Sequence, residues 1–532
     1  MSHSTSSGSL QPPSYEEALS AALGEQGPAR EKFEQEILPT YVQRCRWFGG
    51  KARSPRIFRI QDALPLGESW IVFLKVEYAD ASAETYQLLL ETGAGEIARQ
   101  IQSESPEAVI AVSSTGGTII FDALYGDSAR DALRRLMTSS GKLPGRRGEL
   151  LGISGAVLTE AGEVSSRLLK VEQSNSSIIY GDRVFLKLYR KLEAGINPDA
   201  EITRFLTERQ HFPHVPPFAG ALEYRPEDGA AQVLGLALGL VQNEGDAWTW
   251  ALSEVAAYYE RVLQVSQPAP TPAGLFDEQS LSTETAAVVG EEFLRRAEQL
   301  GTRTGELHLA LAGDSTDPAF APEDFAATDQ QELEQAIRAS TQSLFAALAN
   351  RSADPLIASL LEGASAIEDR LAQLSAGPLQ AAKIRTHGDY HLGQVLNTGA
   401  DFVIIDFEGE PLRPLAERRL KRSPLRDVAG MLRSFHYAAH AGLVTRADRG
   451  ALEPRAEVWS EAASRAFLRG WSEATRGAIF VPHSAGDVIR LLEAFLLEKA
   501  IYEVGYEFNN RPDWLPIPAR GVLRLLHGSS AK

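Results

Sequence analysis

Two short segments in the last third of the chain constrain the fold most: THGDYHLGQVL (386–396) and FVIIDFEGEP (402–411). In the first, Gln394 follows Asp389 by five residues. In the second, an apolar run with β-branched residues typical of a strand ends on Asp406. An ordinary polar turn before a buried strand explains either segment alone. It explains both together, in this order, much less well.

One interpretation is a metal site, because His387, Asp389 and His391 alternate and would share one face of a strand. A zinc or two-metal hydrolase needs further ligands from other clusters. The chain has ten histidines, and pairs such as His211 and His214 lack the spacing of a catalytic metal site. A metallohydrolase is therefore the weaker hypothesis.

The other interpretation is phosphoryl transfer. Kinase-type catalysis needs a carboxylate base, a carboxamide and a carboxylate that hold Mg²⁺, and a lysine on the phosphates. Protein kinases place base and amide as D-x-x-x-x-N, then put the metal aspartate at a strand end. The order here matches, with glutamine replacing asparagine. We therefore predict Asp389 as the base, and Gln394 and Asp406 as Mg²⁺ ligands.

The lysine is predicted upstream, in SNSSIIYGDRVFLKLY (174–189), where Lys187 lies on the strand after a serine-rich turn. Hydroxyl and N–H groups of such a turn can bind phosphates in place of glycines. Glu201, in the next predicted helix, is the candidate partner of Lys187, with Glu193 as the alternative. The serines predicted to contact the nucleotide are Ser174, Ser176 and Ser177.

Bulk properties exclude several classes of function. The formal net charge of −17 argues against binding nucleic acid or an anionic membrane, both of which need a basic face. The longest dense apolar stretch, 233–241, is too short to span a membrane. A single cysteine, Cys45, rules out an intramolecular disulfide, and the N-terminus does not read as a signal peptide. We expect a cytoplasmic protein.

The pattern along the chain predicts two lobes preceded by an extra domain. Residues 1–28 are rich in Ser, Gly and Pro and are predicted to be a disordered tail. Short strand-like runs then continue to a polar junction near Asn243, and amphipathic helical patterns dominate from Ala251 onward.

The segment HGDYHLGQVL…FVIIDFEGEP resembles the catalytic core of the aminoglycoside phosphotransferase-like small-molecule kinases. Together with LPTYVQRCRWFGGKAR, GELHLALA and FLLEKAIYEVGYEFNNRPDWLPIP, it makes residues 33–526 resemble bacterial maltokinases. The resemblance implies an α+β, bilobal protein-kinase-like fold. Its expected parts are an N-terminal cap subdomain (29–105), an intermediate β-rich subdomain completing the N-lobe (106–243) and a helical C-lobe (244–532).

The resemblance also implies a reaction: phosphorylation of maltose by ATP with Mg²⁺, giving maltose 1-phosphate for α-glucan or glycogen synthesis. Some relatives are fused to trehalose synthase, which makes that enzyme a candidate partner. The connection at Val241 and Asn243 would be the hinge that contacts adenine. Lys499, Tyr502 and Tyr506 would line the maltose site, with Arg524 as a further candidate.

The residues themselves support a sugar site near Lys499, because Tyr502 and Tyr506 are four apart and share a helix face. Aromatic faces suit the apolar C–H faces of a sugar. The alternative is core packing by the tyrosines, with Lys499 and Glu503 as a surface pair.

Two other functions stay open. A related kinase acting on glucosamine or an aminoglycoside would use the same catalytic residues, although Lys499 counts against a cationic acceptor. A non-catalytic scaffold is disfavoured because Asp389, Gln394, Asp406 and Lys187 are all present.

Overall fold

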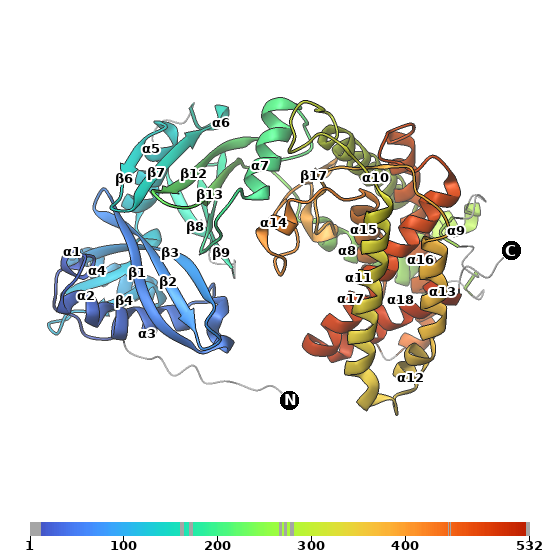
Figure 1. The fold of residues 1–532 in the computed structure, drawn as a ribbon, viewed down its shortest axis with the longest axis horizontal. Coiled ribbons are helices and arrows are strands. Elements are labelled where there is room, and N and C mark those ends of the chain that lie inside the picture. Colours follow the sequence, from blue (N-terminus) through green and yellow to red (C-terminus); the bar gives the residue numbers. More distant parts are fainter. Residues whose placement is uncertain are drawn as a thin grey trace. The chain divides into compact units, whose positions relative to one another are not determined.

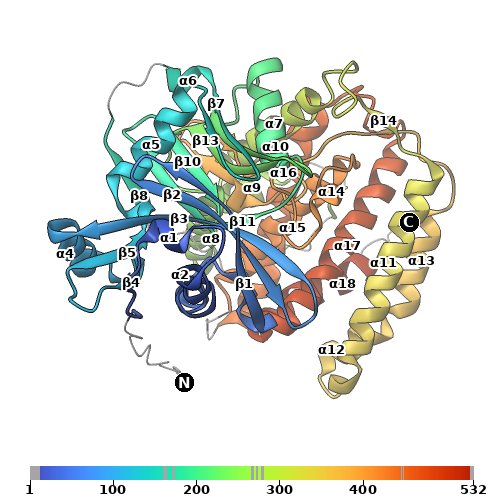
Figure 2. The same cartoon turned by 60° about the vertical axis from the view of Figure 1, so that its left-hand side comes forward.

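The computed structural model describes residues 12–159, 164–169, 174–264, 269–270, 274–276, 281–444, 446 and 448–527. The chain divides into two compact units, one containing 1–204 and 216–241 and the other 205–215 and 242–532. Strands are concentrated in the first unit and helices in the second (Figures 1 and 2). The predicted α+β class, with a β-rich region followed by a helical one, is confirmed.

The first unit contains two antiparallel sheets. One has the order β1-β2-β3-β5-β4, with β11 pairing β3. Its strands are β1 (Pro55–Leu66), β2 (Ser69–Tyr78), β3 (Ala83–Ala94), β4 (Val109–Val112), β5 (Thr118–Asp122) and β11 (Lys191–Leu192). Helical segments of this part are α1 (Leu19–Ala22), α2 (Pro28–Lys32), η1 (Phe33–Ile37), α3 (Leu38–Arg44), η2 (Gly49–Arg53), α4 (Gly95–Glu104), η3 (Pro106–Ala108) and η4 (Ala123–Tyr125).

Part of the segment predicted to be a disordered tail is folded onto this sheet. Ser14 forms a β-bridge with Val112, and the Tyr15 ring packs against Phe33 with centroids 5.4 Å apart. Residues 1–11 lie outside the described residues. The predicted boundary at 105/106 also cuts the sheet, because β4 and β5 follow it and β5 pairs with β3.

The second sheet has the order β6-β7-β12-β13-β10-β9-β8 and places Lys187 on β10, between β9 and β13. Its strands are β6 (Lys142–Pro144), β7 (Gly148–Ser154), β8 (Ser166–Leu169), β9 (Asn175–Tyr180), β10 (Val184–Tyr189), β12 (Phe218–Pro226) and β13 (Gln232–Gly239). The accompanying helices are α5 (Asp127–Thr138), α6 (Ala156–Thr159) and α7 (Pro198–Arg204).

The second unit is built mainly from helices. They are α8 (Ala247–Leu263), α9 (Thr283–Val289), α10 (Glu291–Leu311), α11 (Ala327–Leu348), η6 (Ala349–Arg351), α12 (Pro355–Glu362), α13 (Ala364–Leu374), α14 (Leu415–Arg418), α15 (Leu425–Ala441), α16 (Arg449–Ala474), α17 (Ala485–Asn510), η8 (Pro512–Trp514) and α18 (Pro516–His527). Two small hairpins complete it, β14 (Glu323–Asp324) with β15 (Ala382–Lys383), and β16 (Val395–Asn397) with β17 (Phe402–Ile404).

Helices α10 and α16 approach each other unusually closely through glycines. A Cβ placed on Gly301 would lie 1.9 Å from the carbonyl oxygen of Phe467, and one on Gly470 would lie 1.9 Å from that of Glu298. Only glycine permits backbones to come this close. The two helices therefore form a tightly packed pair beside α15, most of whose side chains are buried.

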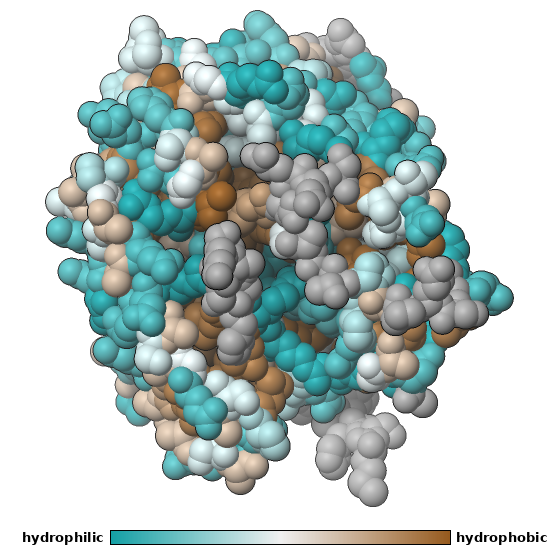
Figure 3. Space-filling view, turned by 90° about the vertical axis from the view of Figure 1, so that its right-hand side faces the viewer, coloured by the Kyte–Doolittle hydropathy of each residue, from teal (hydrophilic) through white to brown (hydrophobic). Residues whose placement is uncertain are grey.

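The surface of the helical unit is mainly hydrophilic on the face shown in Figure 3, with apolar residues in separate groups. Within the described residues, every helix is too short or too polar to cross a membrane.

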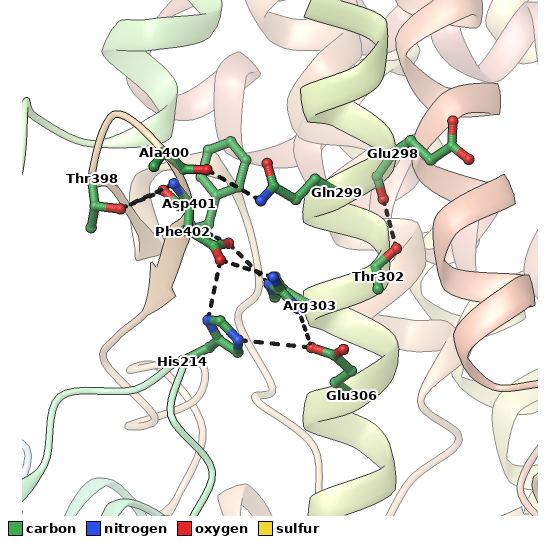
Figure 4. A network of polar contacts seen from close by, with 10 residues as sticks. All are labelled: His214, Glu298, Gln299, Thr302, Arg303, Glu306, Thr398, Ala400, Asp401 and Phe402. Carbon is green, nitrogen blue, oxygen red and sulfur yellow. Dashed lines mark hydrogen bonds and ion pairs between the residues drawn. The ribbon is translucent and has the colours of Figure 1, made fainter.

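The segment 205–215 lies in sequence between the two stretches of the strand-rich unit, but it belongs to the helical unit. It opens with η5 (Phe205–Arg209), where the ring of Phe205 stacks on Phe320 at a centroid distance of 3.5 Å. The His214 ring lies between two carboxylates, 3.9 Å from both Glu306 and Asp401 (Figure 4). The N–H of Ile404, on β17, donates to the His214 carbonyl at 2.8 Å.

Asp401 is a centre of the polar network in Figure 4, because the guanidinium of Arg303 donates to both its oxygens at 2.8 and 2.9 Å. Burial raises the pKa of Asp401, but the hydrogen bonds from Arg303 outweigh it and hold that pKa below its usual range. The ionised carboxylate therefore joins the β16–β17 hairpin to α10.

Candidate active site

The loop that carries Asp389 is fixed through its backbone. The N–H groups of His387 and Gly388 donate to the two carboxylate oxygens of Asp427, on α15, at 2.8 and 3.0 Å. The ring of His387 meets the Ile405 carbonyl at 2.9 Å through Nε2. Gly388 has φ +87°, a conformation that favours glycine. Asp389 thus projects from a loop with little freedom to move.

Asp427 is itself supported by a buried relay. Trp471 donates from Nε1 to His308 Nδ1 at 3.0 Å, so the proton of His308 is on Nε2, which lies 3.2 Å from Asp427. Burial raises the pKa of Asp427, but hydrogen bonds led by the one from His308 leave it below its usual range. Sequence reasoning missed Asp427, His308 and Trp471. His308 lies in the segment GELHLALA, but the pattern of that segment does not identify it as a partner of Asp427.

Asp389 has basic neighbours on both sides. Lys499 Nζ, on α17, lies 3.4 Å from Oδ1, and His391 Nε2 lies 4.0 Å from Oδ2. Burial lowers the pKa of His391, which favours a neutral ring. His391 also accepts the Gly393 N–H through Nδ1 at 3.1 Å. The two histidines of the motif lie where a supporting role requires.

The predicted Mg²⁺ ligands flank the paired end of the β16–β17 hairpin. Val395 pairs with Ile404, and the Ile405 N–H donates to the Gln394 carbonyl at 3.0 Å, which brings Gln394 beside the residue before Asp406. Asp406 has φ +68°, a strained conformation for a non-glycine residue and one that concentrates at functional sites.

Glu408 is an additional candidate ligand that sequence reasoning missed. A carboxylate oxygen of Glu408 lies within 4.8 Å of one of Asp406. Glu408 is the third residue of the Asp-Phe-Glu sequence that begins at Asp406, and this closeness to Asp406 was the available signal. Carboxylate and carboxamide oxygens are donors that suit Mg²⁺.

A cavity of about 80 Å³ opens beside Asp389. Its lining includes Lys499 and Tyr502, two of the residues predicted for the acceptor site, together with Gly388, Tyr390, Glu410, Arg413, Arg426, Asp427, Glu498 and other residues. Tyr506 stacks on Tyr502 with centroids 6.4 Å apart but is outside the lining. Arg524 is also outside it and instead forms an ion pair with Glu457, on α16.

The charged groups of this cavity are paired. Glu410 lies 2.8 Å from Arg413, Glu498 lies 3.3 Å from Arg426, and Asp389 has Lys499. Burial and the neighbouring Glu410 raise the pKa of Tyr502 to about 12, so its hydroxyl keeps its proton at neutral pH. Among the described lining residues, each carboxylate has a cationic or N–H partner.

In the strand-rich unit, Lys187 pairs with Asp199, which was not predicted. Its Nζ lies 3.5 Å from Asp199 Oδ2, and Tyr189 donates its hydroxyl to the same oxygen at 3.1 Å. Asp199 is 2% exposed and belongs to α7, the helix on which Glu201 was expected to act. The Asn-Pro-Asp sequence at the start of that helix was the signal for this residue.

The three predicted serines differ in their surroundings. Ser174 is exposed, whereas Ser176 accepts a hydrogen bond from Arg190 Nε at 2.8 Å. Ser177 is buried opposite Lys187, and among the described residues its hydroxyl has no hydrogen-bond partner. Val241 ends the first unit, and Asn243, in the second, accepts the Gly245 N–H at 3.0 Å through its side chain.

Residues 41–125 match the family model of the maltokinase N-terminal cap domain. A glucosamine kinase from Streptacidiphilus jiangxiensis is 25% identical over 473 residues, covering 87% of this chain and 95% of that protein. A glucosamine kinase from Mycolicibacterium smegmatis is 27% identical over 407 residues, covering 75% and 88%.

A solved structure of a glucosamine kinase in complex with glucosamine, ADP and inorganic phosphate has the same fold. It matches with a TM-score of 0.62 and 20% identity, over 94% of this chain and 100% of that one. The resemblance noted in the sequence is therefore confirmed for the cap domain and for the fold.

Proposed function

We propose that this chain is a cytoplasmic, ATP-dependent kinase that phosphorylates maltose at its anomeric hydroxyl, giving maltose 1-phosphate and ADP for α-glucan or glycogen synthesis. The matched maltokinase cap domain supports this proposal. The relatives named glucosamine kinase support the broader class, a kinase of sugars or amino sugars. A trehalose synthase remains the proposed protein partner.

Asp389 acts as the base. Its carboxylate lies on the cavity wall, where it can accept the proton of a sugar hydroxyl, and the Asp427 bonds to His387 and Gly388 keep it oriented. Lys499, 3.4 Å from Asp389, can donate a hydrogen bond to a sugar oxygen.

The nucleotide and metal sites are proposed from the donor types present. Lys187 would contact the phosphates, with Ser174, Ser176 and Ser177 near it in sequence and Val241 and Asn243 at the adenine. Gln394 and Asp406 would hold Mg²⁺, and Glu408 adds a third oxygen donor. When bound, Mg²⁺ neutralises charge on the transferred phosphoryl group.

The observation that carries the choice of maltose is the charge pairing in the acceptor cavity. An amino sugar brings an ammonium group, which needs an available carboxylate to replace its hydration. Here Glu410 and Glu498 already have arginine partners, and Lys499 places a positive charge beside Asp389. A neutral sugar meets no such penalty and can use Tyr502 as a stacking face.

The test is ADP release over a panel of maltose, glucose, glucosamine, trehalose and kanamycin, with Asp389→Asn as the inactive control. Turnover that is fastest on maltose supports the proposal. Turnover of glucosamine or kanamycin without maltose would replace it by the second candidate, an amino-sugar kinase. Silence on every acceptor would favour a non-catalytic scaffold.

A further inference from the structure

One cluster of potential metal ligands has no part in the proposed kinase chemistry. His436 and His440 are four residues apart on α15 and share a helix face. Glu457 faces them from α16, with Oε1 3.6 Å from His436 Nε2 and 3.1 Å from His440 Nε2. His436 lies nine residues beyond Asp427, about 14 Å along the helix. The cluster is therefore separate from the anchor of the catalytic loop.

His436 is the member of this cluster whose surroundings are incomplete. Its side chain is 2% exposed, and neither Nδ1 nor Nε2 has a hydrogen-bond partner among the residues that the structure describes. A buried ring nitrogen without a partner is costly in free energy, and such groups in native proteins usually have a ligand or a functional role. The Nε2 atom of His436 points toward the same Glu457 oxygen as His440 does.

We propose that His436, His440 and Glu457 form a binding site for one divalent transition-metal ion, of which Zn²⁺ is the best match. The three ligand atoms lie within 4.8 Å of one another. Tetrahedral bonds of about 2.0–2.2 Å place neighbouring ligand atoms about 3.3–3.5 Å apart. The distances from Glu457 Oε1 to the two Nε2 atoms, 3.1 and 3.6 Å, lie just below and just above this range. Two imidazoles and one carboxylate are a donor set that favours zinc over Mg²⁺.

The basic groups around the cluster are compatible with a cation. Arg524, on α18, pairs with Glu457 through Oε2, the oxygen that does not face the histidines. Arg433, also on α15, is 2.6 Å from Glu503, on α17, which offsets its charge. Outer hydrogen-bonding partners commonly orient a metal-binding carboxylate in this way. A bound ion would join α15 to α16 and, through Glu457, to α18.

The experiment is equilibrium dialysis of the tag-free full chain, stripped with a chelator, against Zn²⁺ in excess Mg²⁺, with metal content read by mass spectrometry. We expect one Zn²⁺ per chain and a rise in Tm on adding Zn²⁺. Glu457→Gln preserves the shape of the side chain. The two single variants, Glu457→Gln and His440→Asn, should each bind Zn²⁺ at least about tenfold more weakly than the wild type. The exposed His483, outside the cluster, gives the matched control His483→Asn.

Because Glu457→Gln also weakens the pair with Arg524, the readout is the Zn²⁺-dependent change in Tm and not Tm itself. Co²⁺ added to the stripped protein should give the visible absorption of a four-coordinate nitrogen and oxygen site, and both variants should lose it. Failure of the wild type to bind stoichiometric Zn²⁺ would overturn the proposal. Equal Zn²⁺ affinity in wild type, Glu457→Gln and His440→Asn would do so too.

Discussion

Asp389 in the helical unit and Lys187 in the strand-rich unit are held in place by different means. Asp389 lies on a loop whose backbone N–H groups are held by hydrogen bonds to the carboxylate of Asp427. Lys187 lies on a strand that needs no such support, and its side chain is oriented by Asp199. Asp389 therefore depends on groups that hold its loop, whereas Lys187 depends on contacts made by its own side chain. Substitutions at Asp427 and at Asp199 should therefore change different measured properties of the protein.

The largest expected effect comes from Asp389 itself. Asp389→Asn removes the proposed base and should lower kcat by about 10²–10⁴-fold, while nucleotide affinity is unchanged because Asp389 lines the cavity proposed for the acceptor. ADP release and calorimetric titration with nucleotide measure the two quantities. A parallel loss of nucleotide affinity would contradict the separation of roles.

Asp427→Ala should strongly lower the stability of the protein. It leaves two backbone N–H groups and His308 without their acceptor, at a cost of about 3–5 kcal/mol in the free energy of unfolding. Urea denaturation measures this. Asp369→Ala, on an exposed face of α13, is the matched control and should change stability by less than about 0.5 kcal/mol.

Asp199→Asn should act on the nucleotide side. The loss of its charge releases Lys187, so kcat/KM for ATP should fall by up to about 10²-fold, with KM for maltose unchanged. Glu201→Gln, on the same helix, distinguishes the observed partner from the one expected from sequence. If Glu201→Gln is the more damaging, Lys187 is oriented by Glu201 during turnover.

Lys499→Met should have a moderate effect. It removes a charged donor from the cavity proposed for the acceptor, and we expect about a tenfold rise in KM for maltose. Steady-state kinetics with maltose and glucosamine provide the measurement. Under the proposed function the variant should discriminate less against glucosamine, since a positive charge has gone. An unchanged preference would show that Lys499 does not select the acceptor.

The smallest effect is a pH dependence of stability. The folded-state pKa of Asp427 is lowered, so its contribution is complete above the unfolded value of about 3.9 and is lost as pH falls toward the folded pKa. Wild type should therefore lose more stability than Asp427→Asn between about pH 5 and pH 3. Parallel acid-unfolding curves would argue against an ionised Asp427.

The sequence was most informative where chemistry sets the spacing along the chain. Asp389, Gln394 and Asp406 follow one another within a loop and a hairpin, so their order predicted their neighbourhood. The strand of Lys187 was also predicted correctly, because β9 and β10 are neighbours along the chain and are joined by a tight turn.

Partners supplied by packing were not predictable in this way. Asp427 and His308 meet because α10 and α15 both pack against α16, and nothing along the chain predicts that meeting. The choice between Asp199 and Glu201 depends on which face of α7 turns toward β10, and periodicity in so short a helix does not determine this. Arg524 was expected at the acceptor cavity, but the packing of α18 brings it to Glu457.

The path of the chain limits how the molecule can be divided. The chain passes between the two units at 204/205, 215/216 and 241/242, so no single cut separates them. A fragment ending at 241 would retain Phe205 and Phe212, whose side chains are 3% and 8% exposed in the intact chain, without the helices that cover them. Such a fragment would expose apolar surface and tend to aggregate. Exchange of whole lobes between relatives would accordingly have to transfer residues 205–215 together with the helices.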